Sequence, residues 1–216
     1  MIAEARLQEE VDRFRQWADQ YPLDKRSDWW AEEYPAWAQI DAAVLDYALE
    51  TPPTSWTPEA INDVLYAVAR DDERLALASL LCQRAPAFLY RLAEVALDRG
   101  ERDATWQLAV QLGKSTLPPA GTEKLLLRIA SDADEYVRRH ALMVLARLGS
   151  AATEEIALAA WHQPHENQQW ARMAALWSLH RIQSPRLEEL LAQAEIDARP
   201  YLSDFAKRMR RGEIDE

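Results

Sequence analysis

The chain has 216 residues and a formal net charge of −11 at pH 7, because 36 acidic side chains outnumber 25 basic ones. This charge disfavours nucleic acid as a direct partner and favours a partner that is basic or carries a basic patch. The single cysteine excludes an intrachain disulfide, and the lack of a signal peptide and of any apolar run of roughly 18 residues indicates a cytoplasmic protein with no membrane association.

Residues 1–56 are predicted to form an N-terminal helical cap. One amphipathic helix is expected over residues 3–20 and a second over residues 36–50, because apolar side chains recur there at three- and four-residue steps. The cap holds 12 acidic and 5 basic side chains, and we expect it to cover the first apolar face of a helical stack. The polar connection between its two helices contains two tryptophans and two glutamates, Trp29, Trp30, Glu32 and Glu33.

A second region, residues 57–212, contains repeated helix-start signals and is predicted to continue the cap in a single domain. Proline stands at the first turn of four expected outer helices, and Thr153 begins a fifth. The outer helices are expected over about residues 58–69, 86–98, 119–130, 153–162 and 185–195. The inner helices are expected over about residues 73–84, 102–113, 134–148, 167–182 and 199–211, with polar residues at their starts: Asp72, Asp103, Asp134, Asn167 and Asp197.

The clearest internal similarity lies between residues 134–148 and the segment one repeat later. Val137 aligns with Ala171 at an offset of 34 residues, and the apolar spacing of both segments marks one buried helical face. Asp134 is placed to cap the first segment, and Gly149 is placed to end it in a left-handed conformation. Similarity at this period predicts stacked helix pairs rather than a globular α/β domain.

The pattern Asp-x-x-Val-Arg-x-x-Ala-x-x-x-Leu, which runs from Asp134 to Leu145, resembles the second helix of a HEAT or HEAT-like repeat. The resemblance is closest within residues 122–182. It implies an all-α, right-handed α–α superhelix of about five helix pairs behind the helical cap. It also implies that Arg138 and Arg172 pair with the cap aspartate of a neighbouring repeat. Proteins of this kind are mostly scaffolds, with a few enzymes among them.

The inner helices of such a stack line its concave side, so their residues outside the buried stripe are candidate binding residues. Aromatic, methionine and arginine side chains are enriched in the energetic centres of protein interfaces. The alternative is that these large side chains only fill the seam between neighbouring repeats. Aligning the two best repeats places six such residues on one ridge: Tyr136, Arg139, Met143, Trp170, Met173 and Trp177.

No arrangement of residues in the sequence indicates a catalytic site, a cofactor or a metal. His162 and His165 stand close together, but Pro164 predicts a loop there, and no cysteine or aspartate pair nearby supplies further ligands. The carboxylates at 71–73 and 132–135 stand where helices begin and are interpreted as caps. Only five glycines are present, and they form neither a phosphate-binding loop nor a dinucleotide fingerprint.

These features predict a non-catalytic protein-binding module. The first hypothesis is an acidic inhibitor of the immunity type, which would be steered by charge to a basic, nuclease-like toxin or effector. The alternative is a HEAT-repeat adaptor that binds a peptide in its concave groove. Either the acidic cap or the concave ridge would then hold the partner, and the oligomeric state stays open.

Enzymes with HEAT-like folds supply two lower-ranked alternatives, the alkylpurine DNA glycosylases and the phycobilin lyases. The resemblance to the glycosylases implies a concave site made by Asp134, Trp170, Arg172 and Trp177. Those enzymes must track DNA with basic helices, whereas this chain has one small basic cluster within residues 207–211. Nothing in the sequence points specifically to a lyase, so we expect no enzymatic activity.

Overall fold

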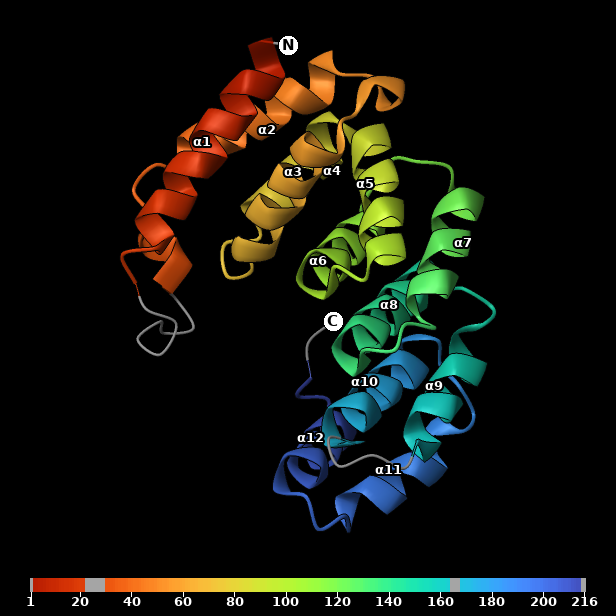
Figure 1. The fold of residues 1–216 in the computed structure, drawn as a ribbon. Helices are drawn as coiled ribbons and strands as arrows, with labels where there is room; N and C mark the ends of the chain where they lie inside the picture. The colour runs from red at the N-terminus through yellow and green to blue at the C-terminus, as the bar shows by residue number, and fades with distance from the viewer. Residues whose placement is uncertain (1, 22–29, 164–167, 215–216) are drawn as a thin grey trace. The chain divides into compact units, whose positions relative to one another are not determined.

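The computed structural model describes residues 2–21, 30–163 and 168–214, and Figure 1 shows that they fold as a series of helices. Within these ranges there are twelve α-helices, two short 3-10 helices and no strand. The 3-10 helices are η2 (Trp30–Glu33) and η3 (Pro53–Ser55). The α-helices are α1 (Ile2–Ala18), α2 (Trp37–Glu50), α3 (Pro58–Arg70), α4 (Ala76–Arg84), α5 (Pro86–Arg99), α6 (Arg102–Leu112), α7 (Pro119–Ile129), α8 (Glu135–Leu148), α9 (Thr153–His162), α10 (Gln168–Arg181), α11 (Leu187–Glu195) and α12 (Pro200–Arg210).

The predicted all-α class is confirmed, and neighbouring helices pack against one another as in a HEAT-like solenoid. The predicted helix ranges agree with the observed ones to within about two residues, apart from the start of α4. None of the described helices is long and apolar enough to cross a membrane.

The start of α4 differs from the prediction. The sequence predicts this helix from residue 73 with Asp72 at its start, whereas α4 begins at Ala76. Leu75 takes a left-handed backbone conformation just before the helix, with φ of 52°. The buried Asp71, and not Asp72, accepts a hydrogen bond from the backbone N–H of Leu77 at 2.6 Å. Asp72 as the cap is therefore wrong, because burial selects one of two adjacent carboxylates that look alike in sequence.

The chain divides into two compact units, residues 1–118 and residues 119–216. In the first unit, α1 and α2 pack against each other and against α3 and α4, while α5 and α6 pack as a pair. The predicted division into a cap of residues 1–56 and a repeat region of residues 57–212 in a single domain stays a prediction.

The first unit is organised around Phe14 of α1, which is fully buried. Its ring contacts five other aromatic rings at centroid distances from 4.8 to 6.2 Å. The indole of Trp37 donates a hydrogen bond to the carbonyl of Ala31 at 2.7 Å, which holds η2 against the start of α2. The rings around Phe14 are Trp17, Trp30, Tyr34, Trp37 and Tyr66.

In the second unit, helices α8, α10 and α12 form an inner row, and α7, α9 and α11 lie on the other side (Figure 1). Helix α10 is central, because it packs against α8, α9, α11 and α12. The core joins both rows through the buried side chains Leu142, Ala146, Ala157, Trp161, Ala175, Leu176, Trp177, Leu179, Leu190, Leu191, Ala194, Leu202, Ala206 and Met209.

A repeated hydrogen bond joins successive helix pairs of the second unit. The hydroxyl of Ser150, after α8, donates to Oε1 of Glu123 in α7 at 2.6 Å. The hydroxyl of Ser184, after α10, donates in the same way to Oε2 of Glu154 in α9 at 2.7 Å. Each serine also accepts the backbone N–H of the residue two positions later. The 34-residue repeat therefore extends from the helices into the connections between them.

The residue before each of these serines has a left-handed backbone, and this leads to a prediction. Gly149 has φ of 68° as expected from the sequence, whereas the corresponding residue is Gln183 with φ of 55°. Because a side chain is disfavoured in this conformation, we expect Gln183→Gly to raise the free energy of unfolding by about 0.5 kcal/mol. Urea denaturation followed by circular dichroism measures the change.

The reverse substitution, Gly149→Gln, is the matched control and is expected to lower the free energy of unfolding by about 0.5–1 kcal/mol. A Cβ atom added at Gly149 would meet nothing within 4 Å, so the effect there isolates the backbone conformation. A loss of stability in Gln183→Gly would contradict this explanation.

Candidate functional site

The inner surface of the second unit contains an open hollow of about 250 Å³ between α8, α10 and α12. All six ridge residues predicted from the sequence lie on its wall. We call the surface around this hollow the inner aromatic face. It is formed by Tyr136, Arg139, His140, Met143, Trp170, Met173, Ala174, Trp177 and Phe205, together with Tyr201 at its edge.

A continuous row of stacked groups crosses the inner aromatic face. The guanidinium of Arg139 lies 4.3 Å from the ring centre of Tyr136 and 5.9 Å from that of Trp170. Trp170 in turn stacks on Tyr201 of α12, with ring centroids 5.6 Å apart and an angle of 30° between the planes. These three rings come from three successive inner helices, so the packing of the helix pairs brings them into one row.

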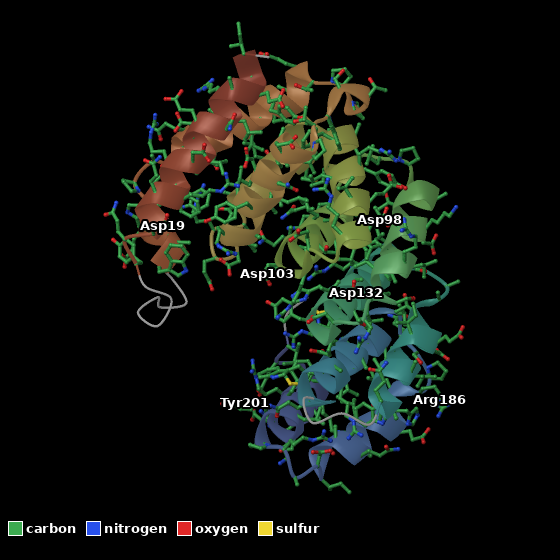
Figure 2. All side chains as sticks on the ribbon, viewed as in Figure 1. Asp19, Asp98, Asp103, Asp132, Arg186 and Tyr201 are labelled. Atoms are coloured by element: carbon green, nitrogen blue, oxygen red, sulfur yellow. The ribbon has the colours of Figure 1, made fainter. Side chains whose placement is uncertain are left out.

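Two aromatic residues of this row are exposed to solvent, and the third, Tyr136, is half-buried. The exposed fraction is 39% for Trp170 and 62% for Tyr201. Figure 2 shows Tyr201 on α12, on the side of the second unit opposite Arg186. Sequence alignment of two repeats missed Tyr201 because it lies 31 residues after Trp170 rather than 34. The signal that would have found it is the buried stripe of α12, in which Leu202 takes the place of Ala171.

The deeper part of the hollow is continuous with the core. Trp177 is only 8% exposed and packs within the hydrophobic cluster of the second unit. Met143 and Met173 are half-buried against the same cluster. Arg147 covers the outer side of Trp177 at 5.1 Å from the ring centre. Trp177 therefore fills the seam between repeats, while Tyr136, Trp170 and Tyr201 form the accessible part of the face.

The charge at the inner aromatic face comes from arginines and not from histidine. His140 Nδ1 lies 2.7 Å from the carbonyl oxygen of Tyr136, and since a carbonyl only accepts, this nitrogen carries the proton. Burial, helped by the neighbouring charges of Arg139 and Arg147, lowers the pKa of His140, so the ring is neutral at pH 7. Arg139 has one distant acidic neighbour, Glu135, at 3.9 Å.

The second predicted surface, in the acidic cap, is only partly described. Trp29 lies outside the described residues. Trp30 is half-buried and stacks on Trp17 at 5.6 Å, so it belongs to the aromatic cluster around Phe14. Glu32 and Glu33 lie on η2 and are both exposed. This region therefore presents two carboxylates to solvent, with the neighbouring indole turned into the core.

The ion pair predicted for Arg172 is present, but its partner Asp197 lies two residues before the cap position of α12, which is Arg199. The guanidinium of Arg172 contacts Oδ2 of Asp197 at 3.2 Å and donates to the carbonyl of Trp161 at 3.0 Å. Hydrogen bonds from Arg199, with the charge of Arg172, lower the pKa of Asp197 to about 2. Arg138 donates to Oε1 of Gln163 at 3.1 Å; the cap predicted for that repeat, at 167, lies outside the described residues.

The residues that would form the catalytic site of a DNA glycosylase, according to the resemblance, make structural contacts in this protein. Arg172 pairs with Asp197, and Asp134 caps α8 by accepting the backbone N–H of Val137 at 3.2 Å. In the basic cluster at the end of α12, Arg210 pairs with two glutamates and Arg211 pairs with Glu213. Two of the four cations in this cluster are therefore used in ion pairs within the protein.

No metal centre is found in the part of the chain that the structure describes. Within those ranges, no three His, Cys, Asp or Glu side chains are grouped closely enough to hold an ion. His162 is exposed at the end of α9, whereas His165 lies outside the described residues.

The second unit is thus a stack of helix pairs whose inner helices carry an exposed aromatic row. Comparison with protein families places it more exactly, because residues 122–204 match the family of HEAT repeats. The HEAT-like resemblance seen in the sequence is confirmed for this segment, which includes α8, α10 and the start of α12. HEAT repeats serve in general as scaffolds for protein interaction rather than as enzymes. A search of curated proteins gave no match.

Proposed function

We propose that this protein is a non-catalytic protein-binding module that holds its partner on the inner aromatic face. The supporting observation is the row of Tyr136, Trp170 and Tyr201, in which each of three successive inner helices contributes one accessible ring. Exposed aromatic groups next to arginine are the side chains that contribute most to protein interfaces. A partner segment lying across the three helices would contact all of them together.

A finer proposal concerns the first unit. Residues 1–118 have a net charge of −9 and residues 119–216 a net charge of −2, so most of the excess negative charge belongs to the first unit. This distribution supports an acidic inhibitor of the immunity type, in which exposed carboxylates such as Glu32 and Glu33 steer a basic, nuclease-like toxin or effector. The inner aromatic face supports the adaptor alternative, in which the bound element is a peptide.

Copurification from the native host, with quantitative mass spectrometry, tests both proposals. We expect Trp170→Ala/Tyr201→Ala to reduce recovery of the partner at least tenfold, since each truncated interface aromatic removes about 1–2 kcal/mol of binding. Both side chains are exposed, so helicity should be unchanged. Ile196→Ala is the matched control, because Ile196 is an apolar residue of the same unit with an exposed fraction of 87%.

Charge reversal of the cap, Glu32→Lys/Glu33→Lys, separates the two binding modes. Loss of one basic partner on charge reversal alone would favour the inhibitor and contradict binding at the inner aromatic face. Loss on the aromatic substitutions alone would favour the adaptor. Recovery of no partner in any sample would contradict both.

A further inference from the structure

The inner aromatic face is bordered by cations although the chain as a whole is acidic. The aromatic stripe of each inner helix continues, three or four residues beyond Met143, Trp177 or Phe205, into an exposed arginine in the last turn. Positive charge is favoured at helix C-termini by the helix dipole, but the dipole does not choose the face on which the charge lies. The three arginines are Arg147, Arg181 and Arg208.

Two of these cations carry charge that the protein does not neutralise locally. Among the described residues, neither Arg147 nor Arg208 forms an ion pair, and the guanidinium of Arg147 lies over the ring of Trp177. Arg210, close by on α12 but off this stripe, is held by Glu188 at 2.9 Å and Glu195 at 2.6 Å. In the last turn of α12, Arg208 on the aromatic stripe therefore has no ion pair, whereas Arg210 off the stripe has two.

The acidic residues near the face are too few to cancel this charge. Glu135 lies 3.9 Å from Arg139, and Asp204 is exposed on α12. Glu213, whose pKa the charge of Arg208 helps to lower, is already paired with Arg211 at 2.6 Å. His140 contributes no charge at neutral pH, because burial lowers its pKa. Arginine charge on the face therefore exceeds carboxylate charge, which is the opposite of the balance in the first unit.

We propose that the inner aromatic face binds an acidic peptide segment, an inference that rests on the proposed protein-binding function. One apolar side chain of the peptide enters the hollow of about 250 Å³, between Met143, Met173 and Phe205. Carboxylates on either side of it reach Arg147 and Arg208, where arginine favours planar, bidentate contact with a carboxylate. The ligand chemistry is therefore an apolar anchor flanked by Asp or Glu.

Single-stranded nucleic acid also combines stacking with negative charge, but the geometry favours a peptide. A nucleic-acid groove carries a row of cations that follows the backbone, together with rings on which successive bases stack. Here Trp170 and Tyr201 stack on each other and Arg139 covers Tyr136, so each of these rings has one face occupied by a neighbour and is not free to take a base on both sides. The hollow has the size for one side chain rather than for a strand.

Selection from a random decapeptide library on the immobilised full-length protein tests the inference. We expect enriched peptides to contain Asp or Glu on both sides of an aromatic or aliphatic residue. For an enriched peptide made synthetically, Arg147→Glu/Arg208→Glu should weaken binding at least tenfold at low salt, and the loss should shrink as salt is raised. Repeating the selection on this variant should enrich Lys and Arg in place of the acidic residues.

Arg186→Glu is the matched charge reversal and should leave peptide binding unchanged. Figure 2 shows Arg186 on the side of the second unit opposite Tyr201, which lies at the edge of the inner aromatic face. Enrichment of basic peptides, enrichment without charge preference, or no enrichment would each overturn the inference. So would binding of a 20-nucleotide oligothymidine that is lost in Trp170→Ala/Tyr201→Ala.

The two proposals fail separately. If the native partner depends on Trp170 and Tyr201 but binds through a basic segment, the protein-binding function stands and the acidic ligand is wrong. If recovery of the partner does not depend on these rings, the proposed use of the inner aromatic face is wrong, whatever the library selects.

Discussion

Replacing Phe14 by alanine is expected to lower the free energy of unfolding of the first unit by about 3–5 kcal/mol, the largest effect of any change considered. Phe14 is fully buried, and its ring contacts five aromatic rings contributed by α1, η2, α2 and α3 and by the residue after η2. Removal of the ring leaves a cavity that these rigid neighbours cannot close. It also removes aromatic pair contacts that contribute beyond area alone.

Urea denaturation, followed by tryptophan fluorescence and circular dichroism, measures this effect, because Trp17, Trp30 and Trp37 all report on the cluster. Leu49→Ala on α2 is the control: Leu49 is 55% exposed, so its loss should change stability by less than about 0.5 kcal/mol. Equal effects of the two substitutions would show that the aromatic cluster does not organise the first unit.

Replacing Asp71 by alanine is expected to lower the free energy of unfolding by about 2–4 kcal/mol. The buried carboxylate accepts the N–H of Leu77 at 2.6 Å and lies 3.2 Å from the guanidinium of Arg74. Arg74 also pairs with Asp41 at 2.8 Å and covers the ring of Trp37 at 4.5 Å. Alanine leaves a buried donor without an acceptor and an arginine with one counter-charge fewer.

Asp71→Asn is the matched control and tests the pH dependence. Burial raises the pKa of Asp71 from its usual value to about 6, although the N–H of Leu77 and the charge of Arg74 both act to lower it. Since the pKa in the folded state exceeds that in the unfolded state, the folded protein binds the proton more tightly. The contribution of Asp71 to the free energy of unfolding therefore falls as the pH rises from about 4 to about 6.

Denaturation of the wild type and Asp71→Asn at pH 4, 5, 6 and 7 measures the difference. Relative to the variant, the wild type should lose about 2–3 kcal/mol between pH 4 and 7. At neutral pH, Asp71→Asn should lower the free energy of unfolding less than Asp71→Ala does, because asparagine keeps an acceptor for the N–H of Leu77. A pH-independent difference between the two proteins would contradict the raised pKa of Asp71.

The sequence could predict most of the candidate site because the site repeats. The 34-residue offset aligned Tyr136 with Trp170 in the sequence, and all six predicted ridge residues line one hollow in the structure. Tyr201 was not predicted because a shorter connection changes the offset in the last repeat to 31 residues. Whether the face binds a partner stays a prediction that only the binding experiments test.

Residues of the same type on one ridge also differ in their exposure to solvent, and the spacing of residues in the sequence does not reveal this difference. Trp170 and Trp177 are seven residues apart on α10, yet the first is 39% exposed and the second is 8% exposed. The difference arises because Trp177 packs in the core cluster with Leu142 of α8 and Leu202 of α12, whereas Trp170 contacts the exposed ring of Tyr201. Trp30 illustrates the same limit, since a residue predicted as a surface contact stacks on Trp17 in the aromatic cluster.

The sequence by itself determined the helical class, the helix boundaries apart from the start of α4, the caps at Asp134 and Gly149 and the repeat, because these depend on residues within a few positions of one another. Only the tertiary structure decided which aromatic rings face solvent, which of two adjacent aspartates is buried and which arginines keep an uncompensated charge. Those properties depend on contacts between helices far apart in the chain, and a local pattern does not contain them.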